Sequence, residues 1–562
     1  MKIALAQINP IVGDLAANTK LIRDAIVQAR SIGARIVVFP ELSICGYPPR
    51  DLLNVEDFTE RCLAAADAIG LQDTNGITIV IGTPDRVANG HTANAVAVYQ
   101  DNTRVGTYHK RLLPTYDVFD EDRYFEPGDQ SLMIEVDGTR IGFAICEDLW
   151  RGQDAGFAAR YSNAADPMSD LAEAGIDVLV VPSASPFVLG KHERHRSIIA
   201  KQANSLGVPV ISVNQCGGND DLIFDGRSCA IDPDGKLLRE AAPFTPDLVL
   251  VDTDKHSESS AKALSWTDER LVIEALTVGV RDYLGKCGFK AACLGLSGGI
   301  DSALTAAIAC RAIGPENVLG AAMPGPFSSE GSITDAYDLA DRLGMRCITM
   351  PIANAYEGHR SILNAAFRAI DQPELGDALP DVAQENLQSR ARGALMMGLS
   401  NRTGSILLTT GNKSEVAVGY CTLYGDMNGG LAVISDVPKT LVFRVCSYLN
   451  EHAQELGFNH PPIPVSTIEK PPSAELAPGQ LDTDSLPPYE VLDEIIERHV
   501  ERRQSSDAII EKTRFDAQLV TRICRLIDLN EYKRRQYAVG LKVTHVAFGP
   551  GRRMPIAQRW IR

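Results

Sequence analysis

A short glycine-rich turn limits the folds open to this chain more than any other segment does. The apolar residues 291–296 predict a buried strand, which leads into Ser297, Gly298 and Gly299, and a helical pattern begins at Asp301. Glycines let the backbone approach a bulky anion, and a helix N-terminus offers free N–H groups. A carboxylate is compatible with phosphate when Mg²⁺ lies between them. The segment therefore predicts an α/β domain that binds nucleotide phosphates together with Mg²⁺.

This turn is not a Walker A loop. The nearest candidate, residues 279–286, has one residue too many between its glycines and is followed by Cys287 instead of Ser or Thr. Residues 297–302, Ser-Gly-Gly-Ile-Asp-Ser, instead resemble the signature of the PP-loop ATP pyrophosphatases. That resemblance implies cleavage of ATP between its α and β phosphates and adenylation of an acceptor oxygen.

Segments further along the chain indicate which of the PP-loop enzymes this chain resembles. Residues 384–391, 409–416, 469–476 and 480–489 resemble the segments with which NAD⁺ synthetases bind ATP and deamido-NAD⁺. The resemblance implies ATP contacts at Gly295, Leu296, Ser297, Gly298, Gly299, Ile300, Asp301, Ser302 and Thr410. The implied Mg²⁺ ligands are Asp301 and Glu415, and the implied deamido-NAD⁺ contacts are Asn386, Glu415, Tyr420, Cys421, Thr422, Leu423 and Lys533.

Three polar residues lie at or just beyond the ends of apolar runs in the first half of the chain, namely Glu41, Lys110 and Cys146. Taken singly, a free cysteine is most often a core residue, and Glu and Lys are most often solvated. As a set they permit amide chemistry. A nearby base or cation turns a thiol into a nucleophile, and a positive group stabilises the oxyanion of amide hydrolysis.

The local contexts of these residues carry a second resemblance. Pro-Glu-Leu at 40–42 and Cys-Glu-Asp-Leu-Trp at 146–150 resemble the glutamine amidotransferase branch of the nitrilase (carbon–nitrogen hydrolase) superfamily. The resemblance implies that Cys146 is the nucleophile, Glu41 the general base and Lys110 the group that stabilises the tetrahedral intermediate. The implied glutamine contacts are Tyr116, Ser185 and Lys191.

The order of strand-like and helix-like segments along the chain predicts two α/β domains, residues 1–262 and residues 263–562. Short runs rich in Val and Ile alternate with amphipathic helical stretches in both parts. The polar segment 253–262 has no periodicity and is the predicted linker. The basic tail 531–562 holds eight Lys or Arg and one acid, which suits a substrate that carries pyrophosphate.

Residues 461–490 contain eight prolines, so the sequence predicts neither helix nor interior strand there. A long loop inside a compact domain is a functional lid or a linker. The predicted apolar anchors of an ordered loop are Ile463, Val465, Ile468 and Leu476.

The composition of the chain limits the cellular compartment and the kinds of binding partner that we expect for it. The chain carries 72 Asp and Glu against 55 Lys and Arg, a net charge of −17 with a pI near 5.1. A protein with this net negative charge does not bind nucleic acid non-specifically. No run of apolar residues reaches the ~18 residues that a membrane-spanning helix needs. The cysteines include no Cys-x-x-Cys pair, and the spacing of His192 and His195 is more typical of a polar helix face than of a metal site. The predictions are a cytoplasmic location and no nucleic-acid or membrane partner.

The two halves together resemble the glutamine-dependent NAD⁺ synthetases. That resemblance implies an N-terminal α-β-β-α nitrilase-like sandwich followed by a doubly wound parallel-sheet PP-loop domain of the adenine nucleotide alpha hydrolase-like type. It also implies a homo-oligomer that uses L-glutamine, ATP and deamido-NAD⁺ with Mg²⁺. Two alternatives stay open: another PP-loop amidotransferase or tRNA-modifying enzyme fused to a carbon–nitrogen hydrolase, or an inactive nucleotide-binding scaffold.

Overall fold

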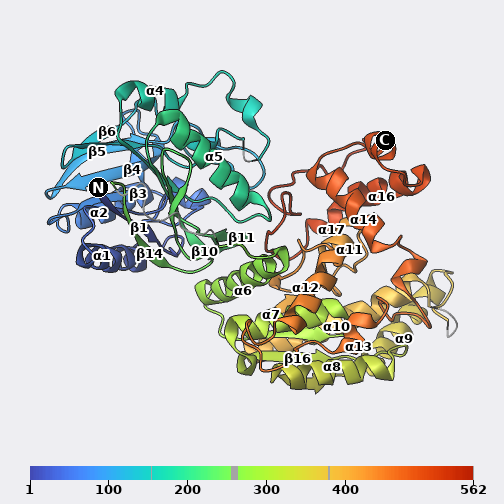
Figure 1. Cartoon of the computed structure of the whole chain (residues 1–562). Helices are drawn as coiled ribbons and strands as arrows, with labels where there is room; N and C mark the ends of the chain where they lie inside the picture. Colours follow the sequence, from blue (N-terminus) through green and yellow to red (C-terminus); the bar gives the residue numbers. More distant parts are fainter. Residues whose placement is uncertain (154, 255–263, 377–379, 561–562) are drawn as a thin grey trace. The chain divides into compact units, whose positions relative to one another are not determined.

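The structure of the chain is a computed structural model that describes residues 1–153, 155–254, 264–376 and 380–560 (Figure 1). It divides into two compact units, Met1–Trp266 and Thr267–Arg562. Residues 255–262 of the predicted linker lie outside the described residues. None of the helices that the structure describes has the length and hydropathy that a bilayer crossing needs.

Two six-stranded sheets form the centre of the first unit. The first sheet has the order β14-β1-β2-β3-β4-β5, and the second has the order β13-β12-β9-β8-β7-β6. The strands of the first are β1 (Lys2–Gln7), β2 (Ile36–Val38), β3 (Thr78–Arg86), β4 (Thr92–Gln100), β5 (Thr103–His109) and β14 (Asp247–Asp252). Those of the second are β6 (Met133–Val136), β7 (Thr139–Phe143), β8 (Val178–Ser183), β9 (Val210–Asn214), β12 (Cys229–Ile231) and β13 (Leu237–Glu240). A separate ribbon pairs β10 (Cys216–Asn219) with β11 (Leu222–Asp225).

The alternation of side chains along β1 explains the layering. Ile3 and Leu5 belong to a core shared with the second sheet, whereas Ala4 packs on the other face beside Ile22 of α1. Helices α1 (Leu15–Ser31) and α2 (Phe58–Gly70) pack against the first sheet, and α4 (Pro167–Ala174) and α5 (Lys191–Leu206) against the second. This arrangement confirms the predicted α-β-β-α sandwich.

The second unit is built on a parallel five-stranded sheet of order β17-β16-β15-β18-β19. Its strands are β15 (Ala292–Leu296), β16 (Val318–Ala322), β17 (Arg346–Thr349), β18 (Ile406–Thr409) and β19 (Leu431–Ala432). The order runs outward in both directions from β15, which is the doubly wound pattern that the sequence predicted. In such sheets ligands bind beyond the carboxyl ends of the strands where the order reverses. The Ser297 turn follows β15 at that position.

The helices of the second unit are α6 (Asp268–Lys286), α7 (Ile300–Ile313), α8 (Glu330–Leu343), α9 (Ala353–Ala369), α10 (Val382–Thr403), α11 (Lys413–Val418) and α12 (Lys439–Glu451). A C-terminal group follows: α13 (Val465–Glu469), α14 (Tyr489–Ile496), α15 (Ser506–Lys512), α16 (Ala517–Leu529) and α17 (Glu531–Arg534). Part of this group, α14 to α16, encloses a small apolar core of its own that includes Leu492, Ile509 and Ile523.

The proline-rich segment departs from its prediction in two respects. It contains the short helix α13 and the start of α14, and a proline, Pro464 or Pro488, directly precedes each helix, where a missing N–H costs no intrahelical hydrogen bond. Ile463 is fully buried as predicted, but Val465 is 60% exposed and anchors nothing. The strand predicted at residues 291–296 is present as β15.

Candidate active sites

Two buried carboxylates hold an ammonium group in the first unit. Nζ of Lys110 lies 2.7 Å from Oε1 of Glu41 and 2.9 Å from Oε1 of Glu121. Glu41 also accepts hydrogen bonds from Nδ2 of Asn94 at 2.7 Å and from N–H of Ala184 at 2.9 Å. Burial alone would lower the pKa of Lys110, but the charges of Glu121 and Glu41 raise it well above its usual value. Burial raises the pKa of Glu121 to about 7, although Lys110 opposes that shift.

Cys146 lies just beyond β7, where the chain turns into the short helix α3 (Glu147–Trp150) with φ 44°. Backbone strain of this kind is concentrated at functional sites. Burial and then the charge of Glu41 raise the pKa of the Cys146 thiol, while Lys110 and a hydrogen bond from Trp150 oppose the shift. That bond joins Nε1 of Trp150 to Sγ over 3.3 Å. The structure thus brings the thiol into the fields of Glu41 and Lys110, and the resting thiol needs a base to ionise it.

Asp148 fixes the position of Cys146 relative to Lys110. Its Oδ1 accepts hydrogen bonds from the N–H groups of Arg111 at 3.0 Å and Leu112 at 2.8 Å, just after Lys110. Its Oδ2 accepts from the N–H of Ile145 at 2.9 Å, just before Cys146, and from the hydroxyl of Tyr108 at 2.8 Å. The side chain is fully buried, so one carboxylate joins two segments far apart in sequence.

For the glutaminase activity that the resemblance implies, we expect Asp148→Asn to slow hydrolysis by about 10- to 100-fold, since an amide nitrogen cannot accept hydrogen bonds and a small displacement of a reacting group costs that much. The KM for glutamine should change little. The measurement is steady-state glutaminase kinetics, with the rate of Cys146 alkylation by iodoacetamide as a second readout. Asp24→Asn, an exposed position on α1, is the matched control. Wild-type kcat in Asp148→Asn would contradict the positioning role.

The three predicted glutamine contacts lie in the same unit, and two of them are adjacent. Nζ of Lys191 donates to Oγ of Ser185 at 2.8 Å, and both line a small cavity with Trp150. The hydroxyl of Tyr116 donates to Oε2 of Glu147 at 2.8 Å, and its ring stacks on Phe157 at 4.3 Å. Tyr116 is therefore linked to Glu147, the residue that follows Cys146, and does not line that cavity.

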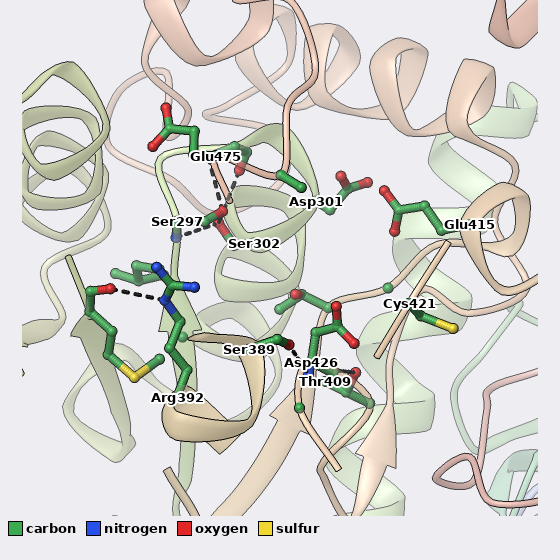
Figure 2. A pocket seen from close by; sticks show the side chains of 18 of the residues that line it. Ser297, Asp301, Ser302, Ser389, Arg392, Thr409, Glu415, Cys421, Asp426 and Glu475 are labelled. Carbon is green, nitrogen blue, oxygen red and sulfur yellow. Dashed lines mark hydrogen bonds between the residues drawn. The ribbon is translucent and has the colours of Figure 1, made fainter. Parts of the chain in front are cut away.

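A cavity of about 310 Å³ opens at the carboxyl ends of β15 and β18 in the second unit (Figure 2). Among the residues implied by the resemblance, those lining it are Gly295, Leu296, Ser297, Gly299, Ile300, Asp301, Ser302, Thr410, Glu415, Tyr420 and Cys421. The turn is held by Oγ of Ser302, which accepts from the N–H of Ser297 at 3.3 Å and donates to the carbonyl of Gly299 at 3.0 Å. Gly298 has φ +74°, and a Cβ there would lie 2.6 Å from the carbonyl oxygen of Ser332. Only glycine fits that position.

Five implied residues do not line this cavity, namely Gly298, Asn386, Thr422, Leu423 and Lys533. Asn386 accepts a hydrogen bond from the hydroxyl of Thr422 at 2.7 Å. Nζ of Lys533 donates to the carbonyls of Gly419 at 2.7 Å and Cys421 at 2.8 Å. Asn386 and Lys533 therefore support the segment around Tyr420 and Cys421 by contacts outside the cavity.

A cation already lies between the two predicted metal ligands. Nζ of Lys439 is hydrogen-bonded to Oδ2 of Asp301 and lies 3.6 Å from Oε1 of Glu415. Burial and then the charge of Asp301 raise the pKa of Glu415 to about 8, against the effect of Lys439. Two carboxylates that repel each other beside the predicted phosphate-binding turn are a donor set that suits Mg²⁺, which binds one or two carboxylates plus phosphate oxygens. Within the described ranges, no group of three or more His, Cys, Asp or Glu side chains is arranged to hold a metal by itself.

The proline-rich segment forms one wall of the cavity. Glu475 accepts hydrogen bonds from the hydroxyls of Ser329 at 3.0 Å and Ser332 at 2.6 Å, at the N-terminus of α8. Nζ of Lys470 lies 3.4 Å from Oε1 of Glu475. This segment is therefore part of the site, as the prediction of an ordered functional loop requires.

Sequence reasoning missed several residues of these sites. No motif surrounds Asn94, Glu121 or Lys439, so the sequence alone does not distinguish them from ordinary solvated residues. Trp150 did carry a signal, because it belongs to the quoted segment 146–150. Lys439 follows a proline at the start of α12 and is 2% exposed, an unusual burial for lysine that only the structure shows.

Comparisons with known proteins assign both units to families. The carbon-nitrogen hydrolase family model matches residues 2–263, and the NAD synthase model matches residues 272–537. A relative from Synechocystis sp., named glutamine-dependent NAD(+) synthetase, is 47% identical over 99% of this chain and 98% of its own length. A protein of the same name from Acinetobacter baylyi is 40% identical over 100% of this chain and 98% of its own length.

Two solved structures cover the chain from end to end. Glutamine-dependent NAD⁺ synthetase from Acinetobacter baumannii, in complex with ADP, superposes with a TM-score of 0.76 at 37% identity and covers 99% of this chain and 98% of its own. The enzyme from Cytophaga hutchinsonii has a TM-score of 0.82 at 23% identity with the same coverage, which shows the shared fold. With two domain matches and full-length relatives well above 30% identity, the chain belongs to the glutamine-dependent NAD⁺ synthetases.

Proposed function

We propose that this enzyme hydrolyses glutamine to ammonia, adenylates deamido-NAD⁺ with ATP, and amidates the adenylate to NAD⁺ with release of AMP and pyrophosphate. Residues 1–262 form the glutamine amidohydrolase domain, and residues 263–562 form the PP-loop synthetase domain with its basic tail. The observation that carries the proposal is the coexistence in one chain of a buried Cys146 beside Glu41 and Lys110, and a separate nucleotide cavity around the Ser297 turn.

The first domain supplies the nitrogen. Sγ of Cys146 attacks the amide carbon of glutamine while Glu41 takes the thiol proton, and Lys110 and the N–H of Trp150 stabilise the developing negative charges. Glu41 returns the proton to the departing amide nitrogen, so that ammonia leaves and a thioester remains. Water, deprotonated by the same carboxylate, cleaves the thioester to glutamate. Tyr116, Ser185 and Lys191 bind the amino-acid end of glutamine.

The second domain activates the acceptor. The turn from Gly295 to Ser302 and Thr410 bind ATP, while the deamido-NAD⁺ contacts are those that the sequence implied, from Asn386 through Tyr420 to Lys533. Asp301 and Glu415 hold Mg²⁺, which when bound neutralises charge on the pyrophosphate leaving group. The buried ammonium of Lys439 holds the two carboxylates together and adds a fixed positive charge at this end of the cavity.

A coupled assay tests the proposal. The enzyme is incubated with ATP, Mg²⁺ and deamido-NAD⁺, with either glutamine or ammonium chloride as donor, and NAD⁺, AMP and pyrophosphate are measured. We expect NAD⁺ from both donors and one AMP for each NAD⁺. Pyrophosphate release triggered by tRNA and not by deamido-NAD⁺ would favour the alternative, another PP-loop enzyme with a different acceptor. The acidic composition argues against that outcome.

We also propose a homo-oligomer and a cytoplasmic location, which the resemblance and the cysteine usage imply. Light scattering after size-exclusion chromatography tests the first point. A single-chain mass of 60.8 kDa in solution would contradict it.

A further inference from the structure

The synthetase cavity contains a cation that none of the implied contacts includes. Arg392 lies on α10 and lines the cavity together with the Ser297 turn. Its Nε donates to the carbonyl oxygen of Met323 at 3.0 Å, which fixes the plane of the guanidinium. Figure 2 shows the guanidinium reaching toward Ser297 and Ser302, on the side of the cavity opposite Asp301.

Arg392 differs from the two lysines of the cavity in its charge partners. Lys439 is paired with Asp301 and Glu415, and Lys470 lies within 4.0 Å of Glu475. Among the residues that the structure describes, no carboxylate lies within that distance of the guanidinium of Arg392. Arg392 is therefore the lining cation whose charge is not neutralised by the protein itself.

Burial makes the positive charge of Arg392 energetically unfavourable when no ligand neutralises it. Burial lowers the pKa of Arg392, and the more distant charges of Glu475 and Asp426 offset that shift only in part. A desolvated cation without a partner is unfavourable, and strongly perturbed groups in a cleft mark binding sites. The guanidinium also packs closely against the backbone at Gly325, because a Cβ added at that glycine would lie 2.7 Å from Nη2 of Arg392. The site is built for an anion with a fixed position.

We propose that Arg392 binds the α-phosphoryl group of ATP and holds it through adenylation, an inference that rests on the proposed function. Asp301, Glu415 and Lys439 line the same cavity, and in the proposed function they serve the pyrophosphate end. An oxygen of the nicotinate carboxylate forms a bond to the α-phosphorus, the bond to the β-phosphate bridging oxygen breaks, and pyrophosphate leaves with the electron pair. Arg392 donates N–H groups to the non-bridging oxygens of the α-phosphate, stays protonated, and keeps AMP oriented until ammonia displaces it.

The test compares Arg392→Ala and Arg392→Lys with Arg402→Ala, an exposed arginine near the end of the same helix. Exchange of labelled pyrophosphate into ATP in the presence of deamido-NAD⁺ isolates adenylation, and calorimetry measures AMP and pyrophosphate binding separately. We expect Arg392→Ala to lose about 10- to 100-fold in exchange and in AMP affinity, the range for a charged hydrogen-bond partner, with pyrophosphate affinity unchanged. Arg392→Lys should lose less, and Arg402→Ala nothing.

Two further measurements separate binding from a structural role. Millimolar guanidinium should restore part of the exchange activity of Arg392→Ala, which a folding defect would not allow. Gly325→Ala keeps the charge but displaces the guanidinium, so it should also weaken AMP binding. Unchanged AMP affinity in Arg392→Ala, or a change in the KM of deamido-NAD⁺ alone, would overturn the assignment. Failure of the wild-type enzyme to form AMP from ATP and deamido-NAD⁺ would instead refute the proposed function.

Discussion

Cys146→Ala should reduce glutamine-dependent NAD⁺ synthesis to background while leaving ammonia-dependent synthesis at the wild-type rate. The substitution removes the sulfur that is proposed to form the thioester, and loss of a covalent nucleophile costs on the order of 10⁴- to 10⁶-fold. The described residues that line the synthetase cavity all belong to the second unit, so the proposed chemistry there does not involve this thiol. The measurement is initial NAD⁺ formation with each donor at saturating ATP and deamido-NAD⁺.

The buried thiol Cys62, on α2 of the same unit, provides the matched control. Cys62→Ala removes a sulfur from a core position and should keep both activities. Equal loss of both activities in Cys146→Ala, with the thermal unfolding curve unchanged, would refute the assignment of separate sites. Retention of glutamine-dependent synthesis would show that Cys146 is not the nucleophile.

Asp301→Asn should have the opposite pattern. We expect synthesis with either donor to fall by about 10²- to 10³-fold, the range for loss of one group that stabilises transition-state charge, while glutaminase turnover persists. Asparagine keeps the shape of the side chain and its contact with Asn412, but it removes the negative charge that faces Lys439. The readouts are AMP formation with ammonia and glutamate formation without ATP, and raised Mg²⁺ should recover part of the first.

Asp341→Asn, at an exposed position of α8, controls for the chemical change alone. It should leave AMP formation at the wild-type rate. If Asp301→Asn kept more than half of the ammonia-dependent rate, Asp301 would not be a ligand of the cation that this reaction needs.

The sequence predictions were more accurate for features that depend on neighbouring residues than for features that depend on contacts between distant parts of the chain. The turn at 297–302 was predictable because its strand, glycines and helix start are consecutive, and each has a local signature. The proline-rich segment was only partly predictable. Prolines exclude the interior of a helix, yet they favour its first turn, and α13 begins directly after Pro464.

By itself the sequence determined the two-part α/β organisation and nominated candidate reacting residues, because strand and helix periods, glycine turns and short motifs are local properties. Only the tertiary structure decided which charges meet. Lys110 pairs with Glu41 across 69 positions of sequence, and it pairs equally with Glu121, which no pattern distinguishes from a solvated acid. The same holds for Lys439, which is neutralised by Asp301 and Glu415, and for Arg392, which has no such partner among the described residues. The pairing of buried charges depends on distance in space and on desolvation, and neither is encoded in the neighbours along the chain.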